Sequence, residues 1–247
     1  MITEHSGAAV IDGLVNLRDL GGLPIEAGGL TRHGRLLRSE SPHGLTEGGR
    51  RALLERGIAT VVDLRTVSER TSLPNLLVEA DGVRGVHAPI FNDDDEFPEG
   101  LNTAADVYCW WLRERGSGIA MAMSAIADSP SAPVLVHCHA GKDRTGVIVA
   151  LALRLAGVGV DAIADDYALS GVQLADMLAR DRVTALANGM DEVRAQRLFT
   201  VRREAMVETV EFIDSEPGGA AGLLGNLGVD DDSIERLLRL LVVTDWP

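Results

Sequence analysis

Short apolar runs alternate with longer segments of helical periodicity along the first part of the chain. The run 58–64 is rich in β-branched residues and is followed by the polar Arg65, a pattern typical of a buried parallel strand whose end opens at a site. In the segment 46–56, Thr46 is a suitable N-cap and Gly57 a suitable stop, which together predict a helix. Further strands are predicted at 36–39, 83–90 and 133–136, and further helices at 103–127, with a break at 116–118, and over 147–153.

The remainder of the chain is predicted to be mostly helical. Helical segments are expected near 161–187, 191–214 and 231–242, and Gly218-Gly219 separates the last two. Strands that alternate with helices predict an α/β fold, with a central, mostly parallel sheet flanked by helices and a helical C-terminal third over 161–247. We expect one domain over 1–247, with a lead-in at 1–15 and a polar turn at 16–22.

The range 92–118 begins with an acidic loop and continues into a segment with unusual aromatic mass, Tyr108-Cys109-Trp110-Trp111-Leu112. Two interpretations are open. The range forms a lid over a site, or the aromatic residues simply pack in the core, which we favour.

Composition narrows the class of protein. With 247 residues and 46% apolar content, the chain is long enough for a sizeable core, which Leu, Val, Ile and Ala must fill because aromatic residues make up only 4%. The net charge of −14 argues against nucleic acid or an anionic membrane as the main partner. The apolar run 147–153 is far shorter than the roughly 20 residues that span a bilayer, so no stable membrane insertion is expected. Composition predicts no oligomeric state.

Two cysteines, Cys109 and Cys138, are too few for a disulfide framework and fit a reducing compartment. The first residues, Met1 to His5, lack the basic start and apolar core of a signal peptide. We therefore expect a cytoplasmic protein, with export without a classical signal as the open alternative.

Candidate chemistry is concentrated between the predicted strand 133–136 and the apolar run 147–153. Five residues separate Cys138 from Arg144 there, in a loop that would wrap one small anion. Free cysteine has a pKa of about 8.5, which a helix N-terminus and nearby cations can lower. Gly141 allows a tight turn, and Arg144 offers planar, bidentate donors. The loop predicts phosphate binding by residues His139, Ala140, Gly141, Lys142, Asp143 and Arg144, and catalysis by Cys138 with Arg144.

Thr145 is predicted as a further catalytic residue, and other neighbours of the loop receive supporting roles. Thr145 is expected to donate a hydrogen bond to the Cys138 thiolate when it departs, and His137 to orient the loop, whereas His139 is more simply a spectator near the mouth. Arg65 and Arg38 end predicted strands, so they brace the loop, meet substrate, or form ordinary salt bridges.

Lys142 is the only lysine of the chain, beside 22 arginines. A GC-rich genome explains the preference for arginine over lysine. It does not explain why the only lysine falls in this loop. Two roles stay open for Lys142: it adds charge beside the substrate, or it forms a salt bridge with a nearby carboxylate.

The proton donor for a leaving group has two sets of candidates. Asp143 adjoins Arg144, and a nearby phosphate dianion would favour its protonated form, which makes it our preferred catalytic acid. Its simpler role is to complement the helix dipole from the first turn. The rivals are Asp93, Asp94 and Asp95 in the acidic loop, which otherwise is only solvated surface.

Other chemistries fit the loop less well. A Walker-type nucleotide loop requires glycine where Val136 stands, so that interpretation fails. A rhodanese-like sulfurtransferase does not match the continuation Arg144-Thr145-Gly146, and an arsenate or sulfur-transfer enzyme needs a resolving cysteine, for which Cys109 is the only candidate. A non-catalytic phosphate-binding module remains as an alternative class.

The sequence His-Cys-His-Ala-Gly-Lys-Asp-Arg-Thr-Gly over 137–146 resembles the signature loop of the cysteine phosphatase superfamily. Lys142-Asp143 resembles, more narrowly, the loop of the bacterial B-type tyrosine phosphatases, which is related to that of lipid phosphatases. The resemblance extends to other segments: 16–22, Arg38-Ser39, 62–65 with Glu69, and 218–241.

The resemblance implies a phosphatase-like fold and a two-step reaction through a cysteinyl phosphate, with no metal or cofactor. It implies phosphate monoester hydrolysis on phosphorylated protein, with phosphotyrosine as the expected substrate and phosphoserine or phosphothreonine as extensions. A phosphoinositide substrate is the alternative within catalysis.

Overall fold

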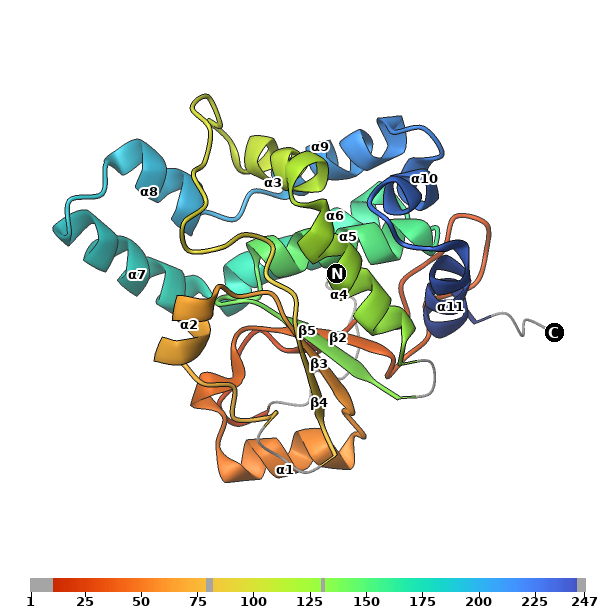
Figure 1. Ribbon diagram of the computed structural model, residues 1–247. Coiled ribbons are helices and arrows are strands. Elements are labelled where there is room, and N and C mark those ends of the chain that lie inside the picture. The colour runs from red at the N-terminus through yellow and green to blue at the C-terminus, as the bar shows by residue number, and fades with distance from the viewer. Residues whose placement is uncertain (1–10, 79–81, 130–131, 244–247) are drawn as a thin grey trace, which may run out of the picture.

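The computed structural model describes residues 11–78, 82–129 and 132–243 and is built on a central five-stranded sheet (Figure 1). The strands lie in the order β1-β2-β5-β3-β4, with β1 antiparallel to β2 and the other neighbours parallel. Their bounds are β1 Arg18–Asp19, β2 Leu36–Ser39, β3 Thr60–Asp63, β4 Arg84–His87 and β5 Val134–His137.

The register of the sheet fixes where a site can form. Ser39 of β2 and Asp63 of β3 both pair with His137, the last residue of β5. The chain segments that follow these three strands therefore leave the sheet side by side at its carboxyl edge, where open α/β sheets bind ligands.

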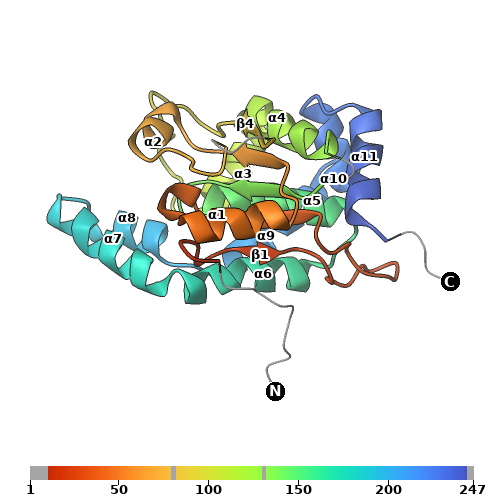
Figure 2. The ribbon, with the colours of Figure 1, turned by 90° about the horizontal axis from the view of Figure 1, so that it is seen from below.

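Helices cover both faces of the sheet, one of them much more heavily (Figures 1 and 2). Side chains alternate along each strand, so Val61 and Leu135 face α1 while Val62 and Val136 face the large helical layer. The helices are α1 Glu47–Glu55, α2 Val67–Ser72, α3 Ala104–Glu114, α4 Gly116–Ala127, α5 Asp143–Leu155, α6 Val160–Gln173, α7 Ala175–Ala187, α8 Glu192–Phe199, α9 Arg203–Ser215, α10 Gly219–Asn226 and α11 Asp231–Leu241, with a 3-10 turn at Pro42–Gly44.

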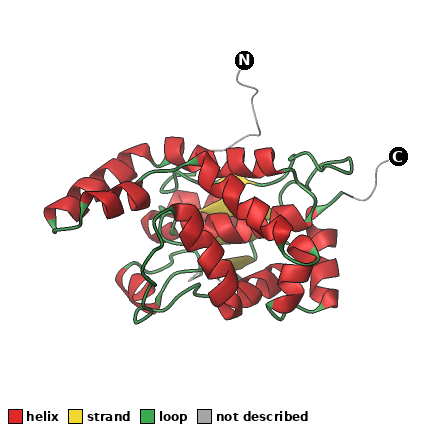
Figure 3. Ribbon diagram, turned by 90° about the horizontal axis from the view of Figure 1, so that it is seen from above, coloured by secondary structure: helices red, strands yellow, loops and turns green. Residues whose placement is uncertain are grey.

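The centre of the helical layer is α5, whose residues 144–153 are all buried. It begins directly after the loop that follows β5, so its N-terminus points at the carboxyl edge of the sheet. None of the described helices combines the length and apolar character needed to cross a bilayer. At the far end of the layer, α7 and α8 pair and project from the body of the molecule (Figure 3).

The structure confirms the α/β class, the mostly parallel sheet and the strand positions predicted from the sequence. The helix at 46–56 is also confirmed, with Thr46 as the N-cap accepting from the Gly49 N–H. Of the predicted lead-in 1–15, residues 1–10 lie outside the described residues. Ile11 and Leu14 are buried below the sheet in the same cluster as Leu53 of α1.

Several predicted boundaries were wrong, mostly because tertiary packing overrides local pattern. The predicted interruption of the stretch 103–127 is confirmed, but it lies at Arg115, one residue before the expected range 116–118. The stretches 161–187 and 191–214 each divide in two, at the buried Leu174 and at the extended residues 200–202.

Besides the 3-10 turn at Pro42–Gly44, three elements were not predicted at all. The polar turn 16–22 contains β1, and α2 follows β3. The Gly218-Gly219 separator instead opens α10, a glycine-rich helix that forms because Leu223 and Leu224 bury their side chains in the core.

Candidate active site

The loop after β5, residues 138–144, is called here the Cys138 loop. The carbonyls of residues 139–142 all accept hydrogen bonds from outside it, given by the Asn16 amide, the Arg38 guanidinium and the Ser41 backbone N–H over 2.8–3.3 Å. The backbone N–H groups of residues 139–145, by contrast, donate to no acceptor within the described residues. Because the C=O of one residue and the N–H of the next point in opposite directions, the outward carbonyls of residues 139–142 turn the N–H groups of residues 140–143 inward, and those of residues 144 and 145 belong to the first turn of α5.

Gly141 is the residue that lets the Cys138 loop turn this tightly. Its φ is 66°, in the left-handed region, and a Cβ there would lie 2.1 Å from the Ser39 carbonyl oxygen. Only glycine fits so close to the end of β2, as the sequence predicted.

Arg38 braces the Cys138 loop from below and is itself held by a buried carboxylate. Its Nη1 lies 2.6 Å from Oδ2 of Asp166 in α6, which also binds Arg18 at 2.6 Å. Burial alone would raise the pKa of Asp166, but the charges of Arg38 and Arg18 hold it below its usual value. Arg38 is fully buried, and it both forms a core salt bridge with Asp166 and donates hydrogen bonds to the carbonyls of the Cys138 loop.

We expect Asp166→Asn to lower the free energy of unfolding by about 3–5 kcal/mol at pH 7, because two buried guanidinium groups lose their counter-charge. A carboxyl group with a depressed pKa stabilises the fold above its unfolded pKa of about 3.9. The difference from the parent should therefore shrink as the pH falls below about 4. Denaturant unfolding at a series of pH values measures the loss of unfolding free energy at pH 7 and its decrease at low pH. Asp165→Asn is the matched control, because Asp165 lies beside Asp166 in α6 but is exposed and pairs with Arg203. It should change the free energy of unfolding little. An equal loss of unfolding free energy in both variants would contradict the expectation.

His137 and Arg65 anchor the strand ends beside the Cys138 loop. Asn75 accepts from the Leu77 N–H, so its amide nitrogen donates to His137 Nε2 at 2.8 Å, while His137 Nδ1 donates to the Cys138 carbonyl at 3.0 Å. Burial lowers the pKa of His137, which favours this neutral, orienting form.

Arg65 is fully buried and binds Asp63, the Ser41 hydroxyl and the Leu73 carbonyl. It therefore braces the segments that follow β2 and β3. Like Arg38, it is placed beneath the site.

Arg144 points into the mouth of the site and carries a carboxylate partner. Its two terminal nitrogens lie 2.6 and 2.7 Å from the two oxygens of Glu69 in α2, and its Cζ lies 4.9 Å from the centre of the Phe91 ring. Burial acts to lower the pKa of Arg144, but the hydrogen bonds that it donates to Glu69 and the nearby negative charges raise that pKa above its usual range. The guanidinium is thus preoriented and permanently charged.

Cys138, the first residue of the Cys138 loop, is 2% exposed. Burial lowers the pKa of the neighbouring His139, whose ring stacks with that of His43 at 6.5 Å. The hydroxyl oxygen of Thr145 is buried and has no hydrogen-bond partner among the described residues, so the expected bond to the Cys138 sulfur is not formed in this structure.

Asp143 opens α5 and receives a hydrogen bond from the hydroxyl of Tyr108. Lys142 is 1% exposed, and its ammonium donates to the Leu198 carbonyl of α8 at 2.6 Å and lies 3.5 Å from Asp143. The geometry thus favours the salt-bridge role for the single lysine.

The three aspartates of the acidic loop lie in different environments. Asp93 accepts from the Ser68 backbone and hydroxyl, and these hydrogen bonds hold its pKa below the usual value. Asp94 is exposed. Asp95 lines the cavity described next and lies 3.6 Å from Arg115.

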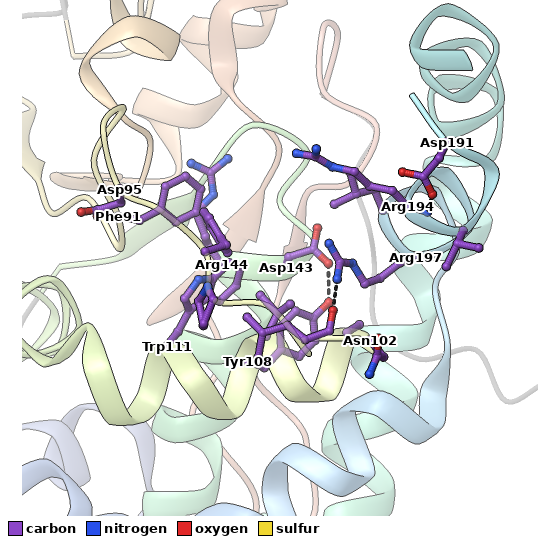
Figure 4. Close-up of a pocket in the computed structure, with 17 residues that line it drawn as sticks. Phe91, Asp95, Asn102, Tyr108, Trp111, Asp143, Arg144, Asp191, Arg194 and Arg197 are labelled. Carbon is purple, nitrogen blue, oxygen red and sulfur yellow. Dashed lines mark hydrogen bonds between the residues drawn. The ribbon is translucent and has the colours of Figure 1, made fainter. Parts of the chain in front are cut away.

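A cavity of about 840 Å³ opens above Asp143 and Arg144. In Figure 4 Asp143 lies between Arg144 and Arg197, with Phe91 and Trp111 along one wall and Arg194 and Arg197 of α8 along the other. The lining also includes Asp95, Phe97, Pro98, Leu101, Asn102, Ala104, Val107, Tyr108, Asp191, Val193 and Leu198. The predicted lid range 92–118 therefore supplies one wall, and Tyr108 and Trp111 are buried core residues of α3, as favoured.

Sequence reasoning missed several residues that hold this site. Asp166 and Tyr167 in α6, Tyr108 in α3 as a partner of Asp143, and Glu69 as a partner of Arg144 come from distant segments. One signal was available for Asp166: it lies on the same helical face as Ile163 and Ser170, where a buried charge requires a buried partner.

Comparison with known proteins places the chain among related sequences. Residues 9–243 match the tyrosine phosphatase family. A tyrosine-protein phosphatase of Nostoc commune is 30% identical over 207 residues, which cover 78% of this chain and 69% of that protein. The triple specificity protein phosphatase PtpB of Mycobacterium tuberculosis is 28% identical over 253 residues, covering 85% of this chain and 92% of that protein. The core catalytic domain of the PP-IP phosphatase SIW14 from S. cerevisiae is 17% identical, with a TM-score of 0.39, and 67% of this chain and 93% of that one are covered.

Proposed function

The chain belongs to the tyrosine phosphatase family, whose members are hydrolases, and from that premise we propose that it cleaves phosphate monoesters through a phosphocysteine at Cys138. Protein phosphotyrosine is the proposed main substrate class. The observation that carries the proposal is the ring of backbone N–H groups of residues 139–145, which donate to no acceptor within the described residues. Buried N–H groups require partners, and the oxygens of a phosphoryl group at a helix N-terminus would supply them.

The proposed chemistry has two steps. The Cys138 thiolate attacks phosphorus while the bond to the ester oxygen breaks, and Asp143 gives that oxygen a proton. Water then attacks the phosphocysteine, Asp143 takes a proton from it, and the sulfur departs as thiolate. Arg144 holds two phosphoryl oxygens throughout, and its charge stabilises the transition state. Thr145, whose buried hydroxyl has no partner among the described residues, would donate to the departing sulfur.

The walls of the cavity support the substrate proposal. Phe91 and Trp111 stack at 5.7 Å beside Arg144, an apolar and aromatic surface suited to the ring of a phosphotyrosine. Arg194 and Arg197 on the opposite wall favour a second candidate, a phosphoinositide with further phosphate groups. The relative PtpB is a triple specificity protein phosphatase, which supports phosphorylated protein as the substrate class. We also propose that the protein acts in the cytoplasm, where its two cysteines would remain thiols.

Phosphate release from phosphotyrosine peptide, phosphoserine peptide and phosphoinositide, each in the presence of a chelator, tests the proposed function. We expect turnover of phosphotyrosine peptide with the highest kcat/KM. Higher kcat/KM on phosphoinositide would overturn the proposed substrate class. Binding of phosphopeptide with no turnover of any substrate by the reduced enzyme would overturn catalysis and favour a binding module.

For the proton donor, we expect Asp143→Asn to lower kcat on phosphotyrosine peptide by on the order of 10²-fold or more, because the phenolate leaves without a proton. With p-nitrophenyl phosphate, whose leaving group is stable as an anion, the loss should be much smaller. Asp95→Asn and Asp93→Asn are matched controls from the acidic loop, and both should behave like the parent. The assignment is wrong if Asp95→Asn shows the leaving-group dependence and Asp143→Asn does not.

A further inference from the structure

The two tyrosines of the chain, Tyr108 and Tyr167, meet beside Asp143. Tyr108 comes from α3, Tyr167 from α6, and Asp143 is the first residue of α5, so three separate helices bring these groups together. Figure 4 shows Tyr108 beside Asp143. Each tyrosine is 1% exposed. Phenylalanine would fill the same apolar space, so packing alone does not require two hydroxyl groups here.

The direction of each hydrogen bond follows from the donors available. An ionised carboxylate only accepts, so the single hydroxyl proton of Tyr108 goes to Asp143 Oδ1. The Tyr108 and Tyr167 hydroxyl oxygens are 2.8 Å apart. Since the proton of Tyr108 is already committed, Tyr167 donates to Tyr108. Burial, and then the charge of Asp143, hold the pKa of Tyr108 well above its usual value, so the hydroxyl keeps its proton.

The two oxygens of Asp143 are therefore unequal. Oδ1 accepts from Tyr108 and lies 3.5 Å from the Lys142 ammonium, whereas Oδ2 has no partner among the described residues. The side chain is 33% exposed and lines the cavity beside Arg144. A proton carried by this carboxyl group consequently belongs on Oδ2, the oxygen left for a substrate.

Building on the role proposed above for Asp143, we propose that Tyr108 is a positioning residue for the general acid and that Tyr167 fixes the orientation of the Tyr108 hydroxyl. Tyr108 holds the carboxyl group through Oδ1, so that Oδ2 passes its proton to the ester oxygen as the phosphorus–oxygen bond breaks. The carboxylate formed by that transfer is stabilised by the hydrogen bond that Tyr108 already makes. Tyr108 keeps its own proton throughout.

Steady-state kinetics of Tyr108→Phe test this role. We expect kcat on phosphotyrosine peptide to fall ~10- to 100-fold, the range for a lost hydrogen bond to a charged group, with a much smaller loss on p-nitrophenyl phosphate. The alkaline limb of the kcat–pH profile should move to higher pH, because the charged carboxylate loses a donor. Tyr167→Phe is the matched control: it removes an equally buried hydroxyl that does not touch Asp143, and it should show both effects more weakly.

Incorporation of 3-fluorotyrosine adds a test of opposite sign. Only positions 108 and 167 change, since the chain has no other tyrosine. Both hydroxyl groups remain and become stronger donors, so the alkaline limb should move to lower pH; movement to higher pH would overturn the proposal.

The outcomes separate this inference from the function on which it rests. If Tyr108→Phe slows both substrates equally and leaves the pH profile unchanged, Tyr108 is merely structural and the inference is wrong. In an Asp143→Asn background, Tyr108→Phe should cost nothing further on phosphotyrosine peptide, and an added loss would also overturn it. If Asp143→Asn itself lacks the leaving-group dependence, the proposed acid fails, and the role of Tyr108 fails with it.

Discussion

Cys138→Ser is expected to reduce phosphate release from phosphotyrosine peptide by at least about 10⁴-fold, because a serine hydroxyl in this loop has no base to activate it. Binding should persist, since the backbone N–H groups of residues 139–145 and the Arg144 guanidinium are unchanged. The measurement is phosphate release together with peptide binding by the same variant. Full activity in Cys138→Ser would end the thiol mechanism.

The chain supplies a matched control for this variant in its second cysteine. Cys109 in α3 is partly buried, and that burial raises its pKa to about 11, so it remains a thiol at neutral pH. Cys109→Ser should retain the parent kcat, and an alkylating agent should inactivate the parent and Cys109→Ser alike. If Cys109→Ser were inactive, a resolving cysteine and a sulfur-transfer or arsenate reaction would return as the better explanation.

Arg144→Lys is expected to lower kcat/KM by roughly 10²- to 10³-fold, the range for losing a preorganised donor to transition-state charge. The positive charge is retained, but an ammonium group cannot hold two phosphoryl oxygens in one plane. It also cannot reproduce the paired hydrogen bonds with Glu69, which fix the guanidinium at the mouth of the cavity.

Steady-state kinetics and thermal unfolding of Arg144→Lys should be compared with Arg154→Lys. Arg154 is also held by carboxylates, in its case those of Asp214 and Glu26, and it is not among the residues that line the cavity. Arg154→Lys should keep the parent kcat/KM. Retention of more than about half of the parent kcat/KM in Arg144→Lys would contradict the proposed role of the guanidinium.

The order of strand, loop and helix around Cys138 could be predicted because it depends on residues that are neighbours in the sequence. An apolar run that ends in a polar loop with glycine and begins an apolar helix permits few conformations, and Gly141 meets the carbonyl of Ser39 as such a turn requires. The same holds for α1, whose cap Thr46 and stop Gly57 adjoin it in sequence. Helix boundaries after residue 160 were less predictable. The division between α6 and α7 at Leu174 and the formation of α10 depend on which side chains are buried, and no capping signal marks them in the sequence.

The residues 138–144 alone are enough to predict the candidate chemistry: one thiol, one arginine and one carboxyl group on a loop that opens a helix. The partners that hold those groups are visible in the folded chain alone, because they lie far along the sequence. Glu69 orients Arg144, Asp166 secures Arg38 beneath the loop, and Tyr108 binds Asp143. A short motif constrains its own backbone through local sterics. The charge and hydrogen-bond partners of its side chains are set by which helices the core packs against it, and no local pattern encodes that choice.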